Sequence, residues 1–416
     1  MALKRYRLVQ RRKMLGFSQE RFASALGVDR STVVRWERAE TDPQPWHRVR
    51  IAEALQVPLD QLQEILDDVS VATPRGSSMG DTPGHTQAAT RAELLTGLRA
   101  FLTRYLPNDG TGRPSASLPD VRRAVARVHG LYQRASYVPA SRHIPDVLRA
   151  ATELTQAGSG IHRATGFKLL AAAYIAASKI ACKVGDGETA LLTADHAATS
   201  AQLADDQALA AVAAYQAACA LLRLPDRLAE AEAITGASID HLGRVRSSPH
   251  PDLTSAQGAL LLLAAIIAAQ QGEVKRAGRH LTQAQALAAD LGFDQNRLWT
   301  GFGPTNVSIH SVSAAVTAGN AERAVEIGSR LDTSRLPIAL VGRRAQVHLD
   351  LAQACAMGSG GSSLAVLHLL EAERVAPEVL GANVQARALL LDLLSKERRT
   401  ATPGLRPMAV RAGLIT

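Results

Sequence analysis

The sequence has few cysteines, and they are not spaced for metal or redox chemistry. Only three occur in 416 residues, Cys182, Cys219 and Cys355, and no Cys-x-x-Cys pair is present. Isolated cysteines in alanine-rich stretches usually behave as small buried hydrophobic residues in a reducing compartment. We therefore expect no disulfide framework, no metal site and no cofactor, and we expect a cytoplasmic location.

Long apolar runs are equally scarce. The longest, at residues 259–269, has eleven residues, whereas a membrane-spanning helix needs about 20. The basic start of the chain is not followed by an apolar segment, as it would be in a secretory signal. Both absences argue against a membrane partner.

Aromatic residues are rare, and alanine is abundant. The chain has 6 Phe, 6 Tyr and 3 Trp against 74 alanines. Sheets favour aromatic and β-branched residues, whereas small side chains allow helices to pack closely. With 46% hydrophobic and 20% charged residues, the composition predicts an all-α protein that buries a sizeable core. The length favours two or three domains or an elongated repeat.

The positive charge is concentrated at the start of the chain. Residues 1–50 contain 12 Lys or Arg and 5 Asp or Glu, a net charge of +7. The other 366 residues contain 35 and 33, a net charge of only +2. This asymmetry predicts that the first segment faces a polyanion and that the rest of the chain does not.

The sequence divides into a head, a linker and a helical body. Eleven of the twenty residues at 71–90 are Gly, Pro, Ser or Thr, a composition typical of a flexible linker. We therefore expect a DNA-binding domain at 1–69, a linker at 70–90 and a repeat domain at 91–416. The patterns predict helices at 3–14, 18–27, 29–38, 44–55 and 59–69, and a helical body to about residue 394 with loops at 107–118, 225, 247–251 and 358–363.

Residues 17–37 have the spacing of a helix-turn-helix. Ser18 can cap the second helix, Gly27 can adopt the left-handed conformation that ends it, and Asp29 can cap the third. Ala23 is small enough for the two helices to cross closely. The inward positions predict a core of Phe22, Leu26, Val28, Val33 and Trp36.

The outward face of the third helix is expected to enter the major groove of double-stranded DNA. Arg30 and Arg35 can each offer two parallel hydrogen bonds to a guanine edge, worth about 1–3 kcal/mol of discrimination. Ser31 and Val34 complete this reading face. Around it, we expect Gln19 and Thr32 to contact phosphates, and Arg11, Arg12 and Arg38 to add salt-sensitive attraction.

This stretch resembles the xenobiotic-response-element family of prokaryotic repressors, the Cro and lambda-repressor type. The resemblance implies a five-helix DNA-binding domain whose third helix reads bases. One departure is Ala39, where the family usually has glycine, so the turn after the third helix is expected to differ slightly. The alternative, five helices used for protein contact only, is disfavoured by the basic charge. The resemblance covers about residues 5–66 and rests on Ser18-Gln19-Glu20, Leu26-Gly27-Val28, Ser31-Thr32, Arg35-Trp36-Glu37 and Ile51-Ala52-Glu53-Ala54-Leu55.

The second domain resembles tetratricopeptide-repeat proteins, with a glycine between two helices and an alanine five residues later. Small residues of this kind let neighbouring helix pairs stack into a curved solenoid. The intervals exceed the standard 34 residues, and an additional pair is expected at 119–156. The alternative is a generic alanine-rich bundle. The matching pairs are Gly185 and Ala190, Gly272 and Ala277, Gly319 and Ala324, and Gly360 and Ala365, while Ala229 and Ala233 mark a degenerate unit.

Residues 299–311 are the least alanine-rich part of this domain and form the candidate ligand site. Counted from Gly319, Asn306 falls at a repeat position that usually lines the inner groove, and it can offer both a donor and an acceptor to a peptide bond. The alternative is that Pro304 simply begins a helix and that Trp299 belongs to the core. The expected site comprises Trp299, Phe302, Asn306, Ile309, His310 and Ser313, with Ala259, Leu262 and Ile266 as an apolar floor.

No catalytic motif stands out in the sequence. Phosphate-loop and zinc-protease motifs are absent, and the twelve histidines are scattered. A Gly-x-Ser-x-Gly string at 76–80 lies in the expected linker, whereas a nucleophile elbow needs a strand before it and a helix after it. We therefore do not expect an enzyme.

These observations predict a sequence-specific DNA-binding transcriptional regulator. Repressor-type heads joined to repeats resemble two-part bacterial regulators, some of which sense peptides in the concave face of the solenoid. Because one head makes few contacts, we expect a homodimer on a partly palindromic site, with a peptide or small-molecule effector acting through the repeats. The alternative is a protein-interaction scaffold that its head recruits to DNA.

Overall fold

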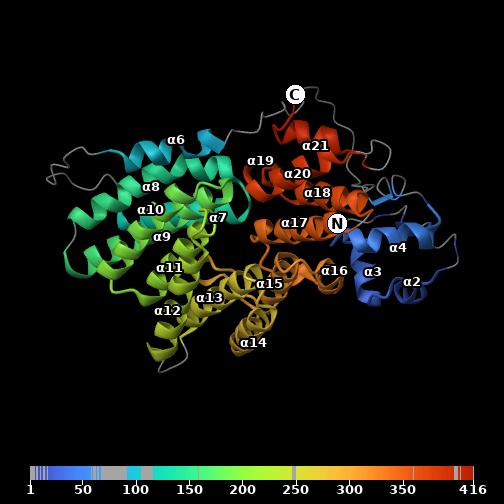
Figure 1. The fold of residues 1–416 in the computed structure, drawn as a ribbon, viewed down its shortest axis with the longest axis horizontal. Helices are drawn as coiled ribbons and strands as arrows, with labels where there is room; N and C mark the ends of the chain where they lie inside the picture. Colours follow the sequence, from blue (N-terminus) through green and yellow to red (C-terminus); the bar gives the residue numbers. More distant parts are fainter. Residues whose placement is uncertain are drawn as a thin grey trace. The chain divides into compact units, whose positions relative to one another are not determined.

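The computed structural model describes most of the chain, and the regular elements are all helical. No strand occurs within the described residues, which confirms the expected all-α fold class. Two compact units are present, residues 1–85 and 86–416, and Figure 1 colours the chain from blue to red. The expected linker at 70–90, including the serine string at 76–80, lies outside the described residues. These are 5, 8–9, 11–12, 15, 17–57, 59, 62, 65–66, 91–104, 116–157, 159–245, 250–358, 360–397, 402 and 404–415.

The first unit contains the two helices and the tight turn that the sequence predicts. Ser18 caps α2 (Gln19–Leu26), because its Oγ accepts a hydrogen bond from Arg21 N at 3.1 Å. Gly27 ends α2 with a φ of 67°. Asp29 occupies the N-cap of α3 (Arg30–Glu37), but its side chain makes no capping hydrogen bond, contrary to expectation. The fourth helix is α4 (Pro45–Leu55), and the helices expected at 3–14 and 59–69 are described only at scattered positions, of which 8–9, 11–12, 59, 62 and 65–66 are helical.

One apolar core fixes these helices against one another. All the inward residues predicted from the sequence belong to it, with Val28 only partly buried. Ala39 keeps the left-handed conformation, with a φ of 54°, that glycine adopts more easily, so the turn after α3 tolerates the alanine. The most deeply buried members are Leu8, Phe22, Leu26, Val33, Ile51, Leu55, Leu62 and Leu66.

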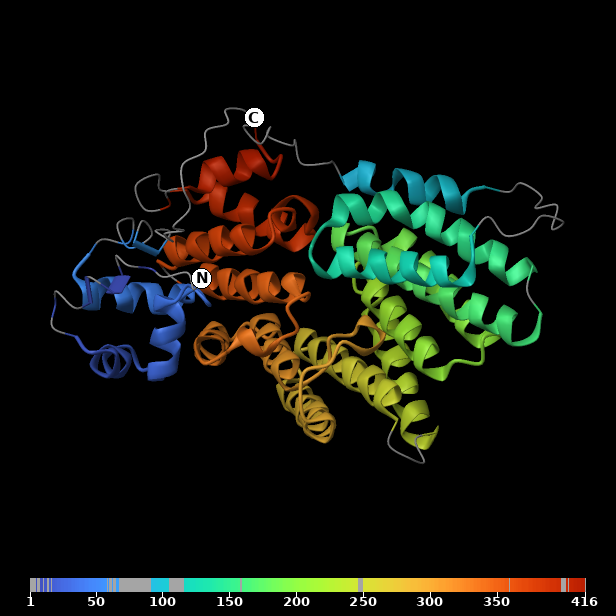
Figure 2. The same cartoon turned by 180° about the vertical axis from the view of Figure 1, so that it is seen from behind.

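The second unit is built from helical hairpins that follow one another along the chain (Figures 1 and 2). The described hairpins are α7 (Leu118–Gln133) with α8 (Tyr137–Ala157), α9 (Gly160–Val184) with α10 (Gly187–Leu203), α11 (Gln207–Leu221) with α12 (Leu228–Val245), α13 (Pro251–Gln270) with α14 (Val274–Leu291), α15 (Pro304–Thr317) with α16 (Ala321–Ser329), and α17 (Val341–Met357) with α18 (Ser362–Val375). Before them lies α6 (Arg91–Leu102), and after them lie α19 (Val379–Ala382), α20 (Val384–Ser395) and α21 (Leu405–Arg411).

The first helices of successive hairpins form one continuous row. In this row α7 contacts α9, α9 contacts α11, and the series continues through α13 and α15 to α17. Because α17 also contacts α7, the row curls back on itself. Stacked hairpins of this kind are consistent with the expected solenoid.

The turn inside each hairpin explains the regular glycine spacing. Gly185, Gly272, Gly319 and Gly360 all have a φ between 76° and 82°, a region that glycine enters without a side-chain clash. The alanine five residues after each glycine is at most 5% exposed and lies against a neighbouring helix. The register that the sequence predicts for these four hairpins is therefore the observed one.

The register predicted for α12 is wrong. Ala229 and Ala233 are exposed, whereas Ala231 is fully buried. The left-handed turn residue of this hairpin is Asp226, with a φ of 58°, and Ala231 follows it by five residues. The spacing of glycines does not reveal this turn, because short polar residues such as aspartate also adopt the left-handed conformation.

Two irregular connections interrupt the part of the body that the sequence predicts as helical. The chain between α14 and α15 contains the short 3-10 turn η1 (Arg297–Trp299), with Leu298 and Trp299 in the left-handed region. The chain between α16 and α17 contains η2 (Thr333–Arg335). The first connection faces the centre of the unit, as described below.

Helix α13 has the length and hydropathy of a membrane-crossing helix. Its apolar window has a mean hydropathy of 1.7, and 78% of that window is buried inside the unit. Neighbouring helices α11, α12, α14 and α15 supply the contacts. Burial on this scale is typical of a central core helix.

Candidate functional site

Helix α3 has a buried face and an outward face, as a recognition helix requires. Val33 and Trp36 point into the core, with exposed fractions of 0% and 3%. Arg30 and Ser31 are exposed, while Val34, Arg35 and Thr32 are half-buried. The residues that the sequence predicts for base contact therefore lie outside the core.

The two arginines of this face do not project side by side. They are five residues apart, which places them about 140° apart around an α-helix, at opposite edges of the outward face. Arg30 Nε lies 3.2 Å from Glu20 Oε1 of α2. Arg35 Nη2 donates to Thr32 Oγ1 at 3.3 Å, and its Nε is buried without a hydrogen-bond partner among the described residues.

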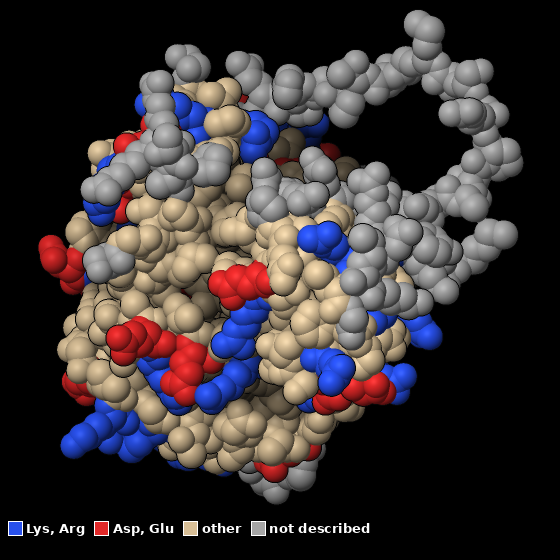
Figure 3. Space-filling model, turned by 90° about the vertical axis from the view of Figure 1, so that its right-hand side faces the viewer, with Lys and Arg blue, Asp and Glu red and all other residues tan. Residues whose placement is uncertain are grey.

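Two exposed arginines of the head, Arg30 and Arg38, lie beside carboxylates. Arg38 Nη1 lies 3.7 Å from Glu40 Oε1, with both side chains about half exposed. Basic and acidic side chains also lie next to one another on the face that Figure 3 draws. Exposed pairs of this kind contribute about 0–1 kcal/mol, so a phosphate group can replace the carboxylate at little cost.

Arg12 is buried and paired with Glu37, which contradicts the prediction that its charge adds salt-sensitive attraction to DNA. The residue is 4% exposed, and its Nε donates to Glu37 Oε1 at 2.5 Å. Its Nη1 donates to the carbonyl of Phe17 at 2.5 Å. Glu37 Oε2 also accepts a hydrogen bond from Nε2 of the half-exposed Gln19 at 2.6 Å. The charge of Arg12 supports the fold of the head.

Arg11 also has a structural role that the sequence does not indicate. Its Nε donates to Leu55 O at 2.9 Å and its Nη2 to Gln56 O at 3.1 Å, where α4 ends. A cation at the C-terminal end of a helix is stabilised by the negative end of the helix dipole. Two further arginines of the head, Arg21 and Arg50, are exposed, and Arg50 lies next to the turn at Gly27.

Comparison with known families bears on this unit. The Helix-turn-helix family model matches residues 8–62. Those residues form a helix-turn-helix domain. The match supports a DNA-binding regulator, and the tetratricopeptide resemblance of the second unit has no family match in its support. No curated protein matches the chain.

The second unit encloses a cavity of about 720 Å³ at the centre of its curled row of helices. Most of the lining comes from the first helix of every hairpin, from the connection before α15 and from α20, and Tyr137 at the start of α8 and Leu340 before α17 add to it. A volume of this size lies in the range of small-molecule sites. The described hairpins thus place their concave faces around one shared space.

Three of the six predicted ligand residues line this cavity. Trp299, His310 and Ser313 belong to the lining, and so does Ile266 of the expected apolar floor. Of the other floor residues, Ala259 and Leu262 are buried outside the lining. The lining stripe of α15 runs through His310, Ser313 and Thr317, which is one helical turn later than the stripe predicted from the repeat position.

The remaining three predicted residues are core residues. Phe302 is fully buried, and its ring packs directly against the backbone of Gly258. A Cβ atom added at Gly258 would lie 2.1 Å from Cζ of this ring. Ile309 is 1% exposed on the flank of α15. Asn306 is 1% exposed, and its backbone carbonyl lies 2.9 Å from His310 Nδ1. None of these three residues belongs to the lining of the cavity.

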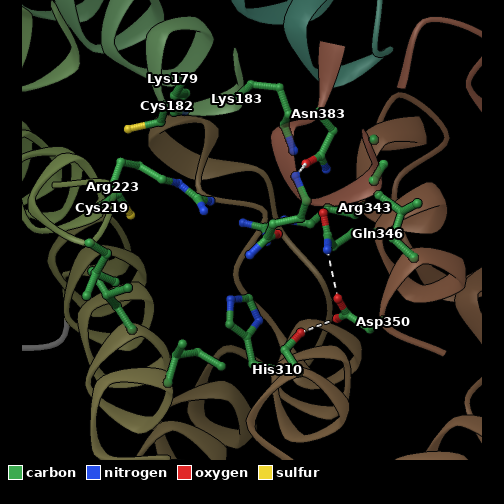
Figure 4. Close-up of a pocket in the computed structure, with 18 of the residues that line it drawn as sticks. Lys179, Cys182, Lys183, Cys219, Arg223, His310, Arg343, Gln346, Asp350 and Asn383 are labelled. Atoms are coloured by element: carbon green, nitrogen blue, oxygen red, sulfur yellow. Dashed lines mark hydrogen bonds between the residues drawn. The ribbon is translucent and has the colours of Figure 1, made fainter. Parts of the chain in front are cut away.

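Sequence reasoning missed the basic residues of the cavity. Lys179, Lys183, Arg223 and Arg343 line it, and they come from α9, from the end of α11 and from α17. Figure 4 shows the side chains of Lys183, Arg223 and Arg343 pointing into the same space. Burial lowers the pKa of Lys179 to about 7, with a further contribution from Arg343. Burial, with Arg223 and Arg343, lowers the pKa of Lys183 to about 8.

A single carboxylate faces these cations among the described lining residues. Asp350 of α17 accepts hydrogen bonds from Ser313 Oγ and, at 2.8 Å, from Gln346 Nε2. Burial raises the pKa of Asp350 to about 6. Burial and Arg343 lower the pKa of His310 to about 3, so its imidazole is neutral at physiological pH.

The three cysteines carry no disulfide, and Cys182 and Cys219 line the cavity. Burial raises the pKa of both thiols, which disfavours the reactive thiolate. Within the described residues, no group of three or more His, Cys, Asp or Glu side chains is placed to hold a metal ion.

Proposed function

We propose that this chain is a sequence-specific transcriptional regulator whose second unit is a tetratricopeptide-like sensor of an effector molecule. The observation that supports DNA binding most directly is the match of residues 8–62 to the Helix-turn-helix family, with α3 presenting its polar face outward. The observation that supports sensing is the central cavity of the second unit. The regulator is proposed to act in the cytoplasm.

In this proposal Ser31, Val34 and the two arginines at the edges of α3 read base edges in the major groove. Arg35 Nε has no hydrogen-bond partner among the described residues, which favours this role, because a base acceptor would supply the missing hydrogen bond. Thr32, Arg38 and the half-exposed Gln19 contact the phosphate backbone. A homodimer would place two such helices in successive major grooves.

The test uses the full chain and DNA selected by it from a random library. Replacing Arg35 with alanine is expected to cost about 1–3 kcal/mol and to relax the base preference at one position. Arg38→Ala is expected to weaken binding to all sequences and to reduce the salt slope by about one. Arg335→Ala is the matched control, since this side chain is 80% exposed in the second unit.

The proposal fails if Arg35→Ala and Arg335→Ala bind the selected DNA with the same affinity and the same base preference. Light scattering of the complex checks the homodimer, because two chains per selected site are expected. If a protein partner binds in stoichiometric amounts while DNA binding does not respond to it, the scaffold alternative is supported instead of effector sensing.

A further inference from the structure

The basic residues of the central cavity come from distant parts of the chain and meet in one place. Lys183 lies near the end of α9, Arg223 just after α11, and Arg343 in the first turn of α17. Lys179 precedes Lys183 by one helical turn, and its Nζ donates to the carbonyl of Trp299 at 3.1 Å. Helix α9, the residues just after α11 and helix α17 thus each place basic side chains in the same cavity (Figure 4).

These cations are not neutralised by the protein. None of the four forms an ion pair among the described residues. Asp350 is the one acidic side chain of the described lining, and it is engaged by Ser313 and Gln346. The lowered pKa values of both lysines have the same cause, which is burial beside further positive charge. Four basic side chains that share one cavity with a single, already hydrogen-bonded carboxylate favour the binding of an anion.

The rest of the lining suits the neutral part of an organic molecule. Half-buried aromatic rings of Tyr132, Tyr215 and Trp299 form one part of the wall, and Leu263 and Ile266 form an apolar part. Side-chain amides that can donate or accept are interspersed among them. The amide-bearing lining residues are Gln133, Gln216, Gln270, Gln346, Gln353, Asn383 and Gln385.

We infer that this cavity binds a small organic anion with at least two negative charges, either a phosphoryl group or paired carboxylates, held by Lys183, Arg223 and Arg343. A single carboxylate would leave most of the positive charge uncompensated. Arginine forks and lysine ammonium groups both form charge-assisted hydrogen bonds to phosphate and to carboxylate. The anion is the effector of the regulator, a step that rests on the proposed function.

Anion binding would also draw the two sides of the cavity together. Arg223 belongs to one side of the curled row and Arg343 to the other, and the two guanidinium groups repel each other without a ligand. An anion bound between Arg223 and Arg343 would attract both guanidinium groups and so offset the repulsion between them. A ligand that favours one arrangement in this way shifts the population of the whole unit.

The experiment measures anion binding to the full chain in the absence of DNA. Inorganic pyrophosphate and citrate are the probes, added at constant ionic strength and followed by calorimetry and by tryptophan fluorescence, to which Trp299 in the cavity wall contributes. We expect at least one probe to bind more tightly than about 1 mM. Tight binding of pyrophosphate alone identifies phosphoryl chemistry, and tight binding of citrate alone identifies carboxylate chemistry.

Variants test whether the named residues hold the probe. Arg343→Gln and Lys183→Gln are each expected to weaken binding by about tenfold or more. Asp350→Asn is expected to strengthen binding several-fold, because it removes the opposing charge and retains a hydrogen-bonding side chain. Arg335→Gln is the exposed control and is expected to leave the affinity unchanged.

The inference is overturned if neither probe binds below about 1 mM, or if Arg343→Gln binds as well as the control. The Asp350→Asn gain keeps the test valid where a lost cation also lowers stability, since unfolding cannot raise affinity. Because no DNA is present, failure here leaves the proposed DNA binding standing, and failure of the DNA test leaves the anion site standing.

Discussion

The indole ring of Trp299 lies flat against the imidazole of His129, with ring centroids 3.7 Å apart and planes inclined by 3°. His129 of α7 is fully buried, and its Nε2 lies 2.9 Å from Ala172 O of α9. Lys179 of α9 donates to the carbonyl of the same Trp299. The connection before α15 is therefore fastened to the first two hairpins of the unit, where it closes one side of the cavity.

This stacking predicts different outcomes for two replacements of Trp299. Trp299→Ala is expected to lower the free energy of unfolding by about 2 kcal/mol or more, because it removes a half-buried ring and the stacking of that ring on His129. Trp299→Phe keeps an aromatic face on His129 and is expected to cost less than about 1.5 kcal/mol. Urea unfolding followed by circular dichroism measures both values, and equal losses would contradict a role for the stacked ring.

Two helical glycines are expected to respond in opposite directions to alanine. At Gly258 the added Cβ would lie 2.1 Å from the fully buried Phe302 ring, so Gly258→Ala is expected to cost about 1–3 kcal/mol through overpacking. At Gly278 of α14 no atom lies within 4 Å of the added Cβ, so Gly278→Ala is expected to gain up to about 1 kcal/mol. Urea midpoints of the two variants decide this, and a shift in the same direction would be the contrary result.

The buried pair in the head predicts a large stability loss at a residue that looks like a DNA contact. Arg12→Met leaves the Glu37 carboxylate buried without its charged partner and is expected to cost about 3–5 kcal/mol. Arg30→Met breaks an exposed pair with Glu20 and is expected to cost at most about 1 kcal/mol. Hydrogen exchange of the full chain localises the effect, because faster exchange is expected in residues 17–57 for Arg12→Met only.

The helix-turn-helix and the hairpin turns could be predicted from the sequence because both depend on local chemistry. Gly27 and Gly185 are needed where the backbone enters the left-handed region, and alanines are needed where helices cross closely. The same logic failed at α12, where Asp226 takes the glycine's place. It also placed Arg12 on the surface, because a count of charges does not tell which of them a folded domain buries.

The cavity could not be predicted because its residues meet only after the hairpins stack. Lys183, Arg223 and Arg343 occupy no common motif, and each alone is typical of a solvated helix end. The candidate site at 299–313 was found by its unusual composition. Half of it proved to be core, because aromatic residues such as Phe302 fill the irregular connection from inside.

The buried lysines predict that stability rises with pH between about 7 and 8.5. The folded-state pKa of Lys179 is about 7, whereas an unfolded lysine titrates near 10.4, so in this window the unfolded chain binds more protons and a rise in pH favours the folded state. The other groups that face the lysines do not titrate there when folded. They are His310, neutral because its pKa is about 3, Asp350, ionised because its pKa is about 6, Tyr132, Tyr215 and Cys219, whose pKa values are raised by burial, and the permanently charged Arg223 and Arg343.

The expected gain from pH 7 to 8.5 is about 1–2 kcal/mol, since one unit of pKa difference corresponds to about 1.4 kcal/mol. The cysteines reduce the gain in the upper part of this window and reverse the trend above it, because unfolded thiols ionise near 8.5 and buried ones do not. Lys179→Met removes most of the gain, whereas Lys275→Met on the exposed side of α14 is expected to retain it. Urea unfolding at both pH values measures the difference.

A bound anion stabilises the protonated form of the lysines. Saturating sulfate, whose own charge is constant over this pH range, is therefore expected to make stability depend less on pH. If the slope of stability against pH is unchanged with sulfate bound, the lysines do not face the anion.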